Sequence, residues 1–148
     1  MNSLGDYIIL KKLGMGSFGE VYLAEHRFVK NKVAIKVLPQ ELTTDEKFVE
    51  DFEKDVGILT TLDHPAIVKL HNISQIDGKY FLVMDAMVDN DNEILSLERY
   101  LKYKGDVLPE IEVETILRQI ASCLDYAHKI SFNDDFLAHR SFKLRNNF

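Results

Sequence analysis

The residues most able to do chemistry lie near the N-terminus, in the segment Gly14-Met15-Gly16-Ser17-Phe18-Gly19. Glycine has no side chain, so a glycine-rich turn lets backbone N–H groups approach the oxygens of a phosphate. The same pattern also fits a plain hairpin whose turn requires positive φ angles. The run Glu20–Glu25 that follows is strand-like, whereas a dinucleotide-binding fingerprint requires a helix at that place. The context therefore favours a β-hairpin that covers phosphates.

A lysine follows on the next expected strand, in the run Val33-Ala34-Ile35-Lys36. Side chains alternate between the two faces of a strand, so Ala34 and Lys36 share one face. The small alanine leaves room for a flat ring, and the lysine beside it can reach phosphates. Taken alone, Lys36 is better explained as a surface lysine on a polar face. Its position just after the glycine-rich hairpin reverses that preference.

An acidic residue borders the apolar stripe of the helix expected next. Asp55 lies three residues after Phe52 and four before Leu59, both of which belong to that stripe. An acid on the buried side of a helix requires a cation, and Lys36 is the natural partner. A solvated acid at the rim of the stripe is the alternative.

Strands, turns and helices must position these side chains. A capping box of Thr43 and Glu46 begins the helix that carries Asp55. Asp77-Gly78 predicts a hairpin turn, and the polar connector Asp89–Asn92 separates the strands from a helical part. The expected strands are Tyr7–Leu13, Glu20–Glu25, Val33–Leu38, Ile67–Ile73 and Tyr80–Met84. The expected later helices are Ser96–Lys104 and Pro109–Lys129.

Composition limits the class of protein. The chain has 148 residues, enough for one domain or part of a larger one, and a net charge of -6. That charge argues against a nucleic-acid binder and against a polybasic membrane-surface protein. The single cysteine, Cys123, excludes an internal disulfide framework and a multi-cysteine zinc site. Without an apolar run of about 18 residues or a signal-peptide pattern, the sequence predicts a cytoplasmic protein with no membrane partner.

Taken in order, the motifs resemble those of the first half of a eukaryotic-type Ser/Thr protein kinase domain. The resemblance runs from about Tyr7 to Phe148. Besides the glycine-rich turn and the lysine strand, it rests on His64–Val68, Phe81–Asp85, Ser96–Leu101, Leu124–His128 and His139–Asn146. It implies an α+β fold: a kinase-like small lobe, with a five-stranded antiparallel sheet and one main helix, followed by a truncated helical large lobe. The expected boundary puts the small lobe at residues 1–87 and the start of the large lobe at 88–148.

The resemblance also implies an ATP site, with Mg²⁺ as the accompanying metal. Residues expected around the adenine are Leu13, Val21, Ala34, Met84 and the backbone groups of Asp85 and Met87. Residues expected at the phosphates are Gly14, Gly16, Ser17, Phe18, Gly19 and Lys36, with Asp55 as the ion-pair partner of Lys36. Met84 and Met87 are equally compatible with plain core positions.

The sequence departs from the family pattern at two important positions. Asp55 replaces a glutamate, so its side chain is one methylene shorter and reaches less far toward Lys36. Ser141 replaces the catalytic aspartate, which orients the substrate hydroxyl and accepts its proton. Lys143 matches the pattern, as does Asn146, the expected magnesium ligand. Loss of a positioned base costs about 10²–10⁴-fold in rate.

The last departure concerns the end of the sequence. Two residues follow Asn146, and the Asp-Phe-Gly element that would complete the magnesium site is not among them. We therefore expect weak or no phosphoryl transfer by this chain alone. The alternatives are a non-catalytic, pseudokinase-like module that binds a nucleotide or a partner, and a non-functional truncated remnant. The apolar face of helix 109–129 would meet a protein partner or the missing half of a kinase.

Overall fold

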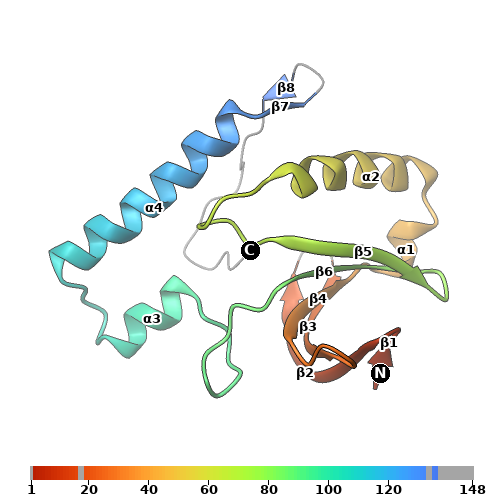
Figure 1. Ribbon diagram of the computed structural model, residues 1–148, viewed down its shortest axis with the longest axis horizontal. Helices are drawn as coiled ribbons and strands as arrows, with labels where there is room; N and C mark the ends of the chain where they lie inside the picture. The colour runs from red at the N-terminus through yellow and green to blue at the C-terminus, as the bar shows by residue number, and fades with distance from the viewer. Residues whose placement is uncertain (1, 17–18, 133–134, 137–148) are drawn as a thin grey trace. The chain divides into compact units, whose positions relative to one another are not determined.

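A curled antiparallel sheet forms the N-terminal part of the chain (Figure 1). The structure is a computed structural model that describes residues 2–16, 19–132 and 135–136. Among these residues, six strands form one sheet in the order β1-β2-β3-β4-β6-β5. Their bounds are β1 Ser3–Leu4, β2 Tyr7–Gly16, β3 Gly19–His26, β4 Lys32–Val37, β5 Leu70–Ile76 and β6 Lys79–Asp85. The short strands β7 Ser131–Phe132 and β8 Asp135–Phe136 pair separately.

The five predicted strands are confirmed, with ends shifted by up to three residues. The predicted turn is confirmed as well, because Asp77 and Gly78 both have positive φ angles, 51° and 75°, as a tight hairpin requires. The two-residue strand β1 was not predicted, since it is too short to show alternation. β6 pairs with β4 and β5 forms the edge, so the last two strands join the sheet in reverse order of sequence.

One face of the sheet carries the main apolar core. Direct partners on neighbouring antiparallel strands point to the same face of a sheet. Side chains of β3, β4 and β6 therefore meet in this core. Removing each large apolar side chain from water stabilises the fold by about 1.5–3 kcal/mol. The buried members of this core are Leu4, Ala24, Val33, Ile35, Phe81 and Val83.

The helix α2 (Glu46–Thr61) packs against this sheet through aromatic side chains. The Phe48 and Phe52 rings stack with centroids 6.2 Å apart, and Phe52 meets the Tyr80 ring of β6 edge-on at 6.3 Å. Phe52 of the predicted apolar stripe thus packs on the sheet, whereas Leu59 of the same stripe is 42% exposed.

The predicted start of α2 was wrong. Thr43 ends a short separate helix, α1 (Gln40–Thr43), which the sequence analysis missed. The Asp45 carboxylate instead accepts the backbone N–H groups of Lys47 at 3.0 Å and Phe48 at 3.3 Å. Asp45 therefore caps the helix, because aspartate satisfies the unpaired N–H groups of a first turn as well as threonine does.

The described backbone divides into two compact units, one of the residues up to Thr61 together with Lys69–Glu93, and one of Leu62–Val68 together with the residues from Ile94 onward. This division differs from a simple cut along the sequence, and the predicted lobe boundary after residue 87 stays a prediction. In the second unit, the helices α3 (Leu97–Tyr103) and α4 (Glu110–Lys129) confirm the two predicted helices. No helix in the described residues is long and apolar enough to span a membrane.

The segment Leu62–Val68 belongs to the same unit as α4 because hydrogen bonds join the two. The backbone N–H of Asp63 donates to the Tyr126 hydroxyl at 2.9 Å, and His64 Nε2 lies 3.1 Å from Ser122 Oγ. The His64 and Tyr126 rings also pack 5.2 Å apart. The His-Pro motif after α2 therefore has a structural role in the second unit.

Gly19 at the start of β3 allows a close approach between two strands. Its φ is +123°, and a Cβ built there would lie 1.9 Å from the Val37 carbonyl oxygen. We predict that Gly19→Ala lowers the free energy of unfolding by about 1–3 kcal/mol, because it adds backbone strain and a clash. Gly14→Ala is the matched control, since its added Cβ has no neighbour within 4 Å. Chemical denaturation would measure both, and equal stability of the two variants would contradict this account.

Candidate nucleotide site

Four of the predicted site residues share one face of the sheet, opposite the main core. Val21 pairs with Lys36, and Ala34 pairs with Met84, so the alternation of the strands puts all four side chains on that face. Val21, Ala34 and Met84 are buried, while Lys36 is half-buried. The result is a largely apolar surface with Lys36 at its side. Such a surface can take a flat ring and hold an anion beside it.

The glycine-rich turn connects the two strands next to this face. Gly16 and Gly19 are direct partners at the ends of β2 and β3, and Gly14 pairs with Val21. The register shifts between Lys12 and Gly14, so Leu13 is an extra residue in β2 beside the position of Val21. The half-buried Leu13 is thus close in register to the residue with which it was predicted to enclose a ring. Ser17 and Phe18 lie outside the described residues.

The environment of Lys36 affects its charge. Burial lowers the pKa of its ammonium group below the ordinary value of 10.5, because the apolar surroundings disfavour the charged form. An anion that binds next to Lys36 would oppose this effect and stabilise the ammonium ion. Asp55 lies within α2, but its side chain is outside the described part of the structure. The ion pair between Lys36 and Asp55 therefore stays a prediction.

The end of β6 is held by side-chain contacts that the sequence analysis missed. The Asp85 carboxylate accepts the backbone N–H of Lys69 at 3.0 Å and lies 2.6 Å from Nε2 of His71. The Asp85 N–H in turn donates to the Lys69 carbonyl at 3.1 Å. The sequence carried no signal for His71, because its contact depends on how β5 pairs with β6. Met87, two residues beyond β6, is 44% exposed.

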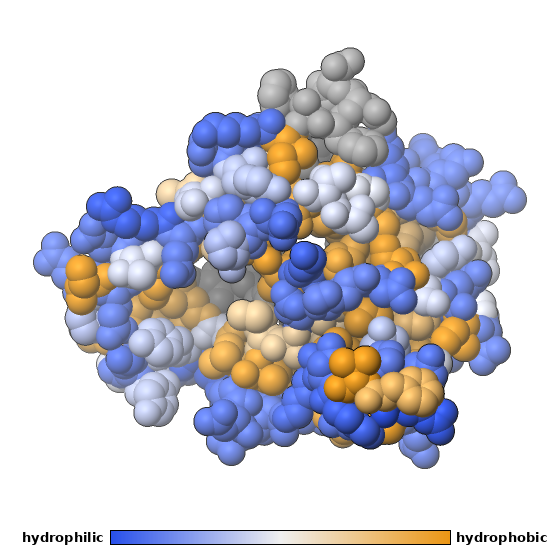
Figure 2. All heavy atoms as spheres, in the orientation of Figure 1, coloured by the Kyte–Doolittle hydropathy of each residue, from blue (hydrophilic) through white to orange (hydrophobic). Residues whose placement is uncertain are grey.

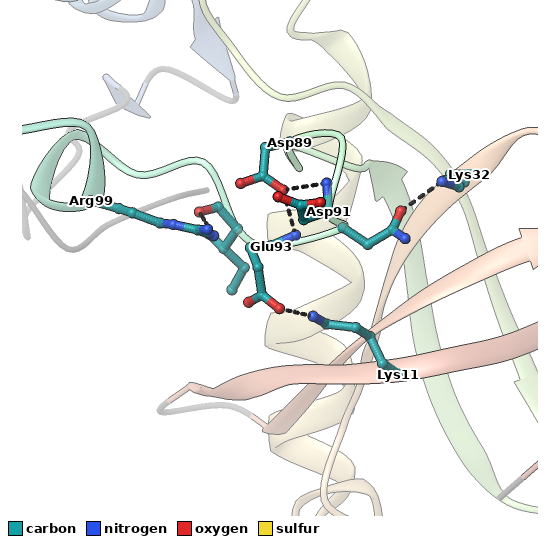
Figure 3. A network of polar contacts seen from close by, with 8 residues as sticks. Lys11, Lys32, Asp89, Asp91, Glu93 and Arg99 are labelled. Atoms are coloured by element: carbon teal, nitrogen blue, oxygen red, sulfur yellow. Dashed lines mark hydrogen bonds and ion pairs between the residues drawn. The ribbon is translucent and has the colours of Figure 1, made fainter. Parts of the chain in front are cut away.

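The polar connector after β6 forms an ordered turn (Figure 3). The Asp89 carboxylate accepts the backbone N–H groups of Asp91 and Glu93, both at 2.9 Å. Lys32 donates to the Asn92 side chain at 2.6 Å, and Lys11 forms an ion pair with Glu93. These contacts tie the connector to β4 and β2, so in the first unit this segment is held by the sheet.

Ser141, Lys143 and Asn146 lie outside the described residues. Among the residues that are described, no group of three or more His, Cys, Asp or Glu side chains could hold a metal ion. Binding of a ring or of phosphates at the described residues stays a prediction.

The second unit contains a hollow of about 500 Å³ between α3 and α4, and none of the predicted nucleotide residues contributes to it. The Tyr100 hydroxyl and Lys104 both donate to Glu112 beside it, at 2.9 and 3.1 Å. Its lining is Leu95, Ser96, Leu97, Tyr100, Ile111, Glu112, Thr115 and Ile116.

Comparisons with known proteins identify similar sequences and a similar solved structure. The chain is 40% identical over 125 residues to serine/threonine-protein kinase pkn1 of Chlamydia caviae, covering 84% of this chain and 20% of that protein. It is 32% identical over 142 residues to serine/threonine-protein kinase PrkC of Bacillus subtilis, covering 96% of this chain and 20% of that protein. Among solved structures, the Mycobacterium tuberculosis PknI kinase domain superposes with a TM-score of 0.66 at 29% identity, covering 86% of this chain and 49% of that one.

The chain thus spans about a fifth of the length of these curated relatives and about half of the solved kinase domain. The model of the protein kinase domain family matches residues 7–148, which is nearly the whole sequence. Together with the Ser/Thr kinases among its relatives, this match shows that the chain belongs to the Ser/Thr protein kinase family.

Proposed function

We propose that this chain binds ATP on the sheet face formed by Val21, Ala34, Lys36 and Met84, as the small lobe of a Ser/Thr protein kinase. The observation that carries the proposal is the register of β4, whose Ala34 and Lys36 pair with both the glycine-turn strand and β6. The match to the protein kinase family supports it independently.

Each part of the nucleotide has a counterpart in this proposal. The adenine lies between Leu13, Val21, Ala34 and Met84, and its polar edge meets the backbone at Asp85 and Met87. The phosphates lie under the turn from Gly14 to Gly19, where backbone N–H groups can donate, and the Lys36 ammonium pairs with their oxygens. Bound ATP would supply the γ-phosphoryl group, and Asn146 is the residue proposed to hold Mg²⁺.

Transfer of that phosphoryl group is proposed to be impaired. A kinase relies on an aspartate to orient the attacking hydroxyl and accept its proton, and Ser141 stands at that position. A serine hydroxyl has no negative charge near neutral pH and is a poor base. The chain would then act mainly as a nucleotide-binding module, which is the alternative that Ser141 favours.

A protein partner is proposed for the second unit. In α3 and α4, which lie wholly within the described residues, no side chain is buried. Ile111 and Leu117 of α4 are 68% and 58% exposed. In Figure 2, hydrophobic residues interrupt the hydrophilic surface on the left, where Figure 1 draws these helices. Exposed apolar surface of this kind favours association with other protein, such as further helices of a kinase large lobe.

We predict that Lys36→Met raises the dissociation constant for Mg-ATP about 10- to 100-fold, because a hydrogen bond to a charged group is lost. Isothermal titration calorimetry would measure the change. Lys79→Met is the matched control, since Lys79 is an exposed lysine of β6 in the same sheet. If both variants bound ATP as tightly as the unmodified chain, Lys36 would not belong to the site.

The lowered pKa of Lys36 predicts a dependence of ATP affinity on pH. Phosphates bind the ammonium form, so binding raises the pKa of Lys36 and takes up protons. Affinity must therefore fall as pH rises through the lowered pKa of the free chain, before lysine's ordinary value of 10.5 is reached. Titrations from about pH 7 to about pH 10 would test this. The Lys36→Met variant should lack that component, and an identical pH profile for the two proteins would contradict the assignment.

Binding and transfer can be measured separately. We predict that the chain binds Mg-ATP yet transfers the γ-phosphate to a general protein substrate at least about 10²-fold more slowly than a kinase with the aspartate. Incorporation of labelled phosphate would measure this, with Lys36→Met as the background. Fast incorporation that depends on Lys36 would contradict the proposed impairment.

A further inference from the structure

Asp85, the last residue of β6, is fixed to β5 and to the residue that precedes it by three contacts. Its N–H donates to the Lys69 carbonyl at 3.1 Å, and its carboxylate accepts the Lys69 N–H at 3.0 Å. The other carboxylate oxygen lies 2.6 Å from Nε2 of His71. A carboxylate only accepts hydrogen bonds, so the imidazole must carry its proton on Nε2 and donate it. We call Lys69, His71 and Asp85 the β6 clamp.

A register shift in β5 lies at His71. Leu70 pairs with Met84 and Asn72 pairs with Val83, which leaves His71 as an extra residue between them. An extra residue in an antiparallel strand bends the strand and redirects a side chain. The Asn72 side chain accepts the N–H of Ile73 at 2.9 Å, which satisfies a backbone donor beside the shift.

The clamp determines which backbone groups of this segment a ligand can use. Because the Asp85 N–H is already bonded to Lys69, a ligand contact at Asp85 must involve its carbonyl. The contacts of the Asp85 side chain fix the backbone at this residue. The direction of the Asp85 carbonyl depends on that backbone, and so does the direction of the Met87 N–H two residues later. A hydrogen bond to a ligand edge requires these groups within narrow limits of distance and angle.

We propose that His71 and the Asp85 carboxylate are positioning residues for the nucleotide, which align the backbone from Asp85 to Met87 with the adenine edge. This inference rests on the proposed ATP site. It adds that affinity for the base depends on an imidazole on the edge strand β5, which need not touch the ligand.

A purely structural role makes a different prediction. The His71 and Asp85 side chains are 41% and 43% exposed, so water competes for their contact and its loss costs little stability. If the clamp served only the sheet, its removal would lower the unfolding midpoint slightly and leave ligand affinity unchanged. If it positions the backbone, affinity for the base must fall while the midpoint changes little.

The test uses two probes, adenosine and Mg-ATP, with the complete chain. His71→Phe keeps a ring but removes the donor, whereas His71→Gln keeps an N–H at a similar distance from the backbone. We expect His71→Phe to lower the affinities for adenosine and for Mg-ATP by the same factor, about 2- to 10-fold, as loss of one hydrogen bond predicts. His71→Gln should restore most of the affinity. Asp85→Asn, which removes an acceptor without changing size, should repeat the effect.

Lys36→Met and Lys79→Met complete the comparison. Lys36→Met should lower the affinity for Mg-ATP more than the affinity for adenosine, since adenosine has no phosphate. Lys79→Met should change neither affinity. Unchanged adenosine affinity in both His71→Phe and Asp85→Asn, with the unmodified chain binding both probes, would overturn the positioning role alone. Failure of the unmodified chain to bind either probe would overturn the proposed function and this inference together.

Discussion

The pairing of β4 with two neighbours at once is the constraint on which the candidate site depends. One neighbour, β3, begins at the glycine-rich turn, and the other, β6, ends at Asp85. Because the side-chain period of a strand is two, slipping β4 by one residue would move Lys36 to the opposite face, among the main core. The deeply buried Val33 and Ile35 oppose such a slip, since they would have to leave that core. Packing of the apolar core on one face thus determines which side chains lie at the candidate site on the other face.

The two segments that border the site are also held by contacts with the sheet. At the glycine-rich turn, Gly19 lets β3 approach the backbone of Val37 more closely than any other residue would allow. At the end of β6, the clamp of Lys69, His71 and Asp85 holds the backbone by side-chain contacts instead. The connector that follows is tied to β2 and β4 by Lys11 and Lys32. In the first unit, the sheet therefore positions both the turn and the strand end.

Sequence reasoning predicted the parts of this fold that depend on local pattern. Alternation located the five longer strands, and apolar spacing located α2, α3 and α4. It also put Ala34 and Lys36 on one face, because this follows from the strand period alone. It missed α1 and β1, which are too short to show a period, and it chose Thr43 over Asp45 as the cap of α2. The His71–Asp85 contact could not be predicted for another reason: it joins residues 14 apart through the pairing of β5 with β6, which no pattern of residue types reveals.

The central claim is that the sheet face around Lys36 binds a nucleotide. Thermal unfolding of the chain with and without Mg-ATP tests it most directly, because a ligand that binds only the folded state must stabilise it. The account predicts a higher midpoint with ATP, equivalent to about 2.7 kcal/mol at a concentration near 100 times the dissociation constant. The shift should be lost in the Lys36→Met variant. A cooperative transition whose midpoint does not change with millimolar Mg-ATP would contradict the claim.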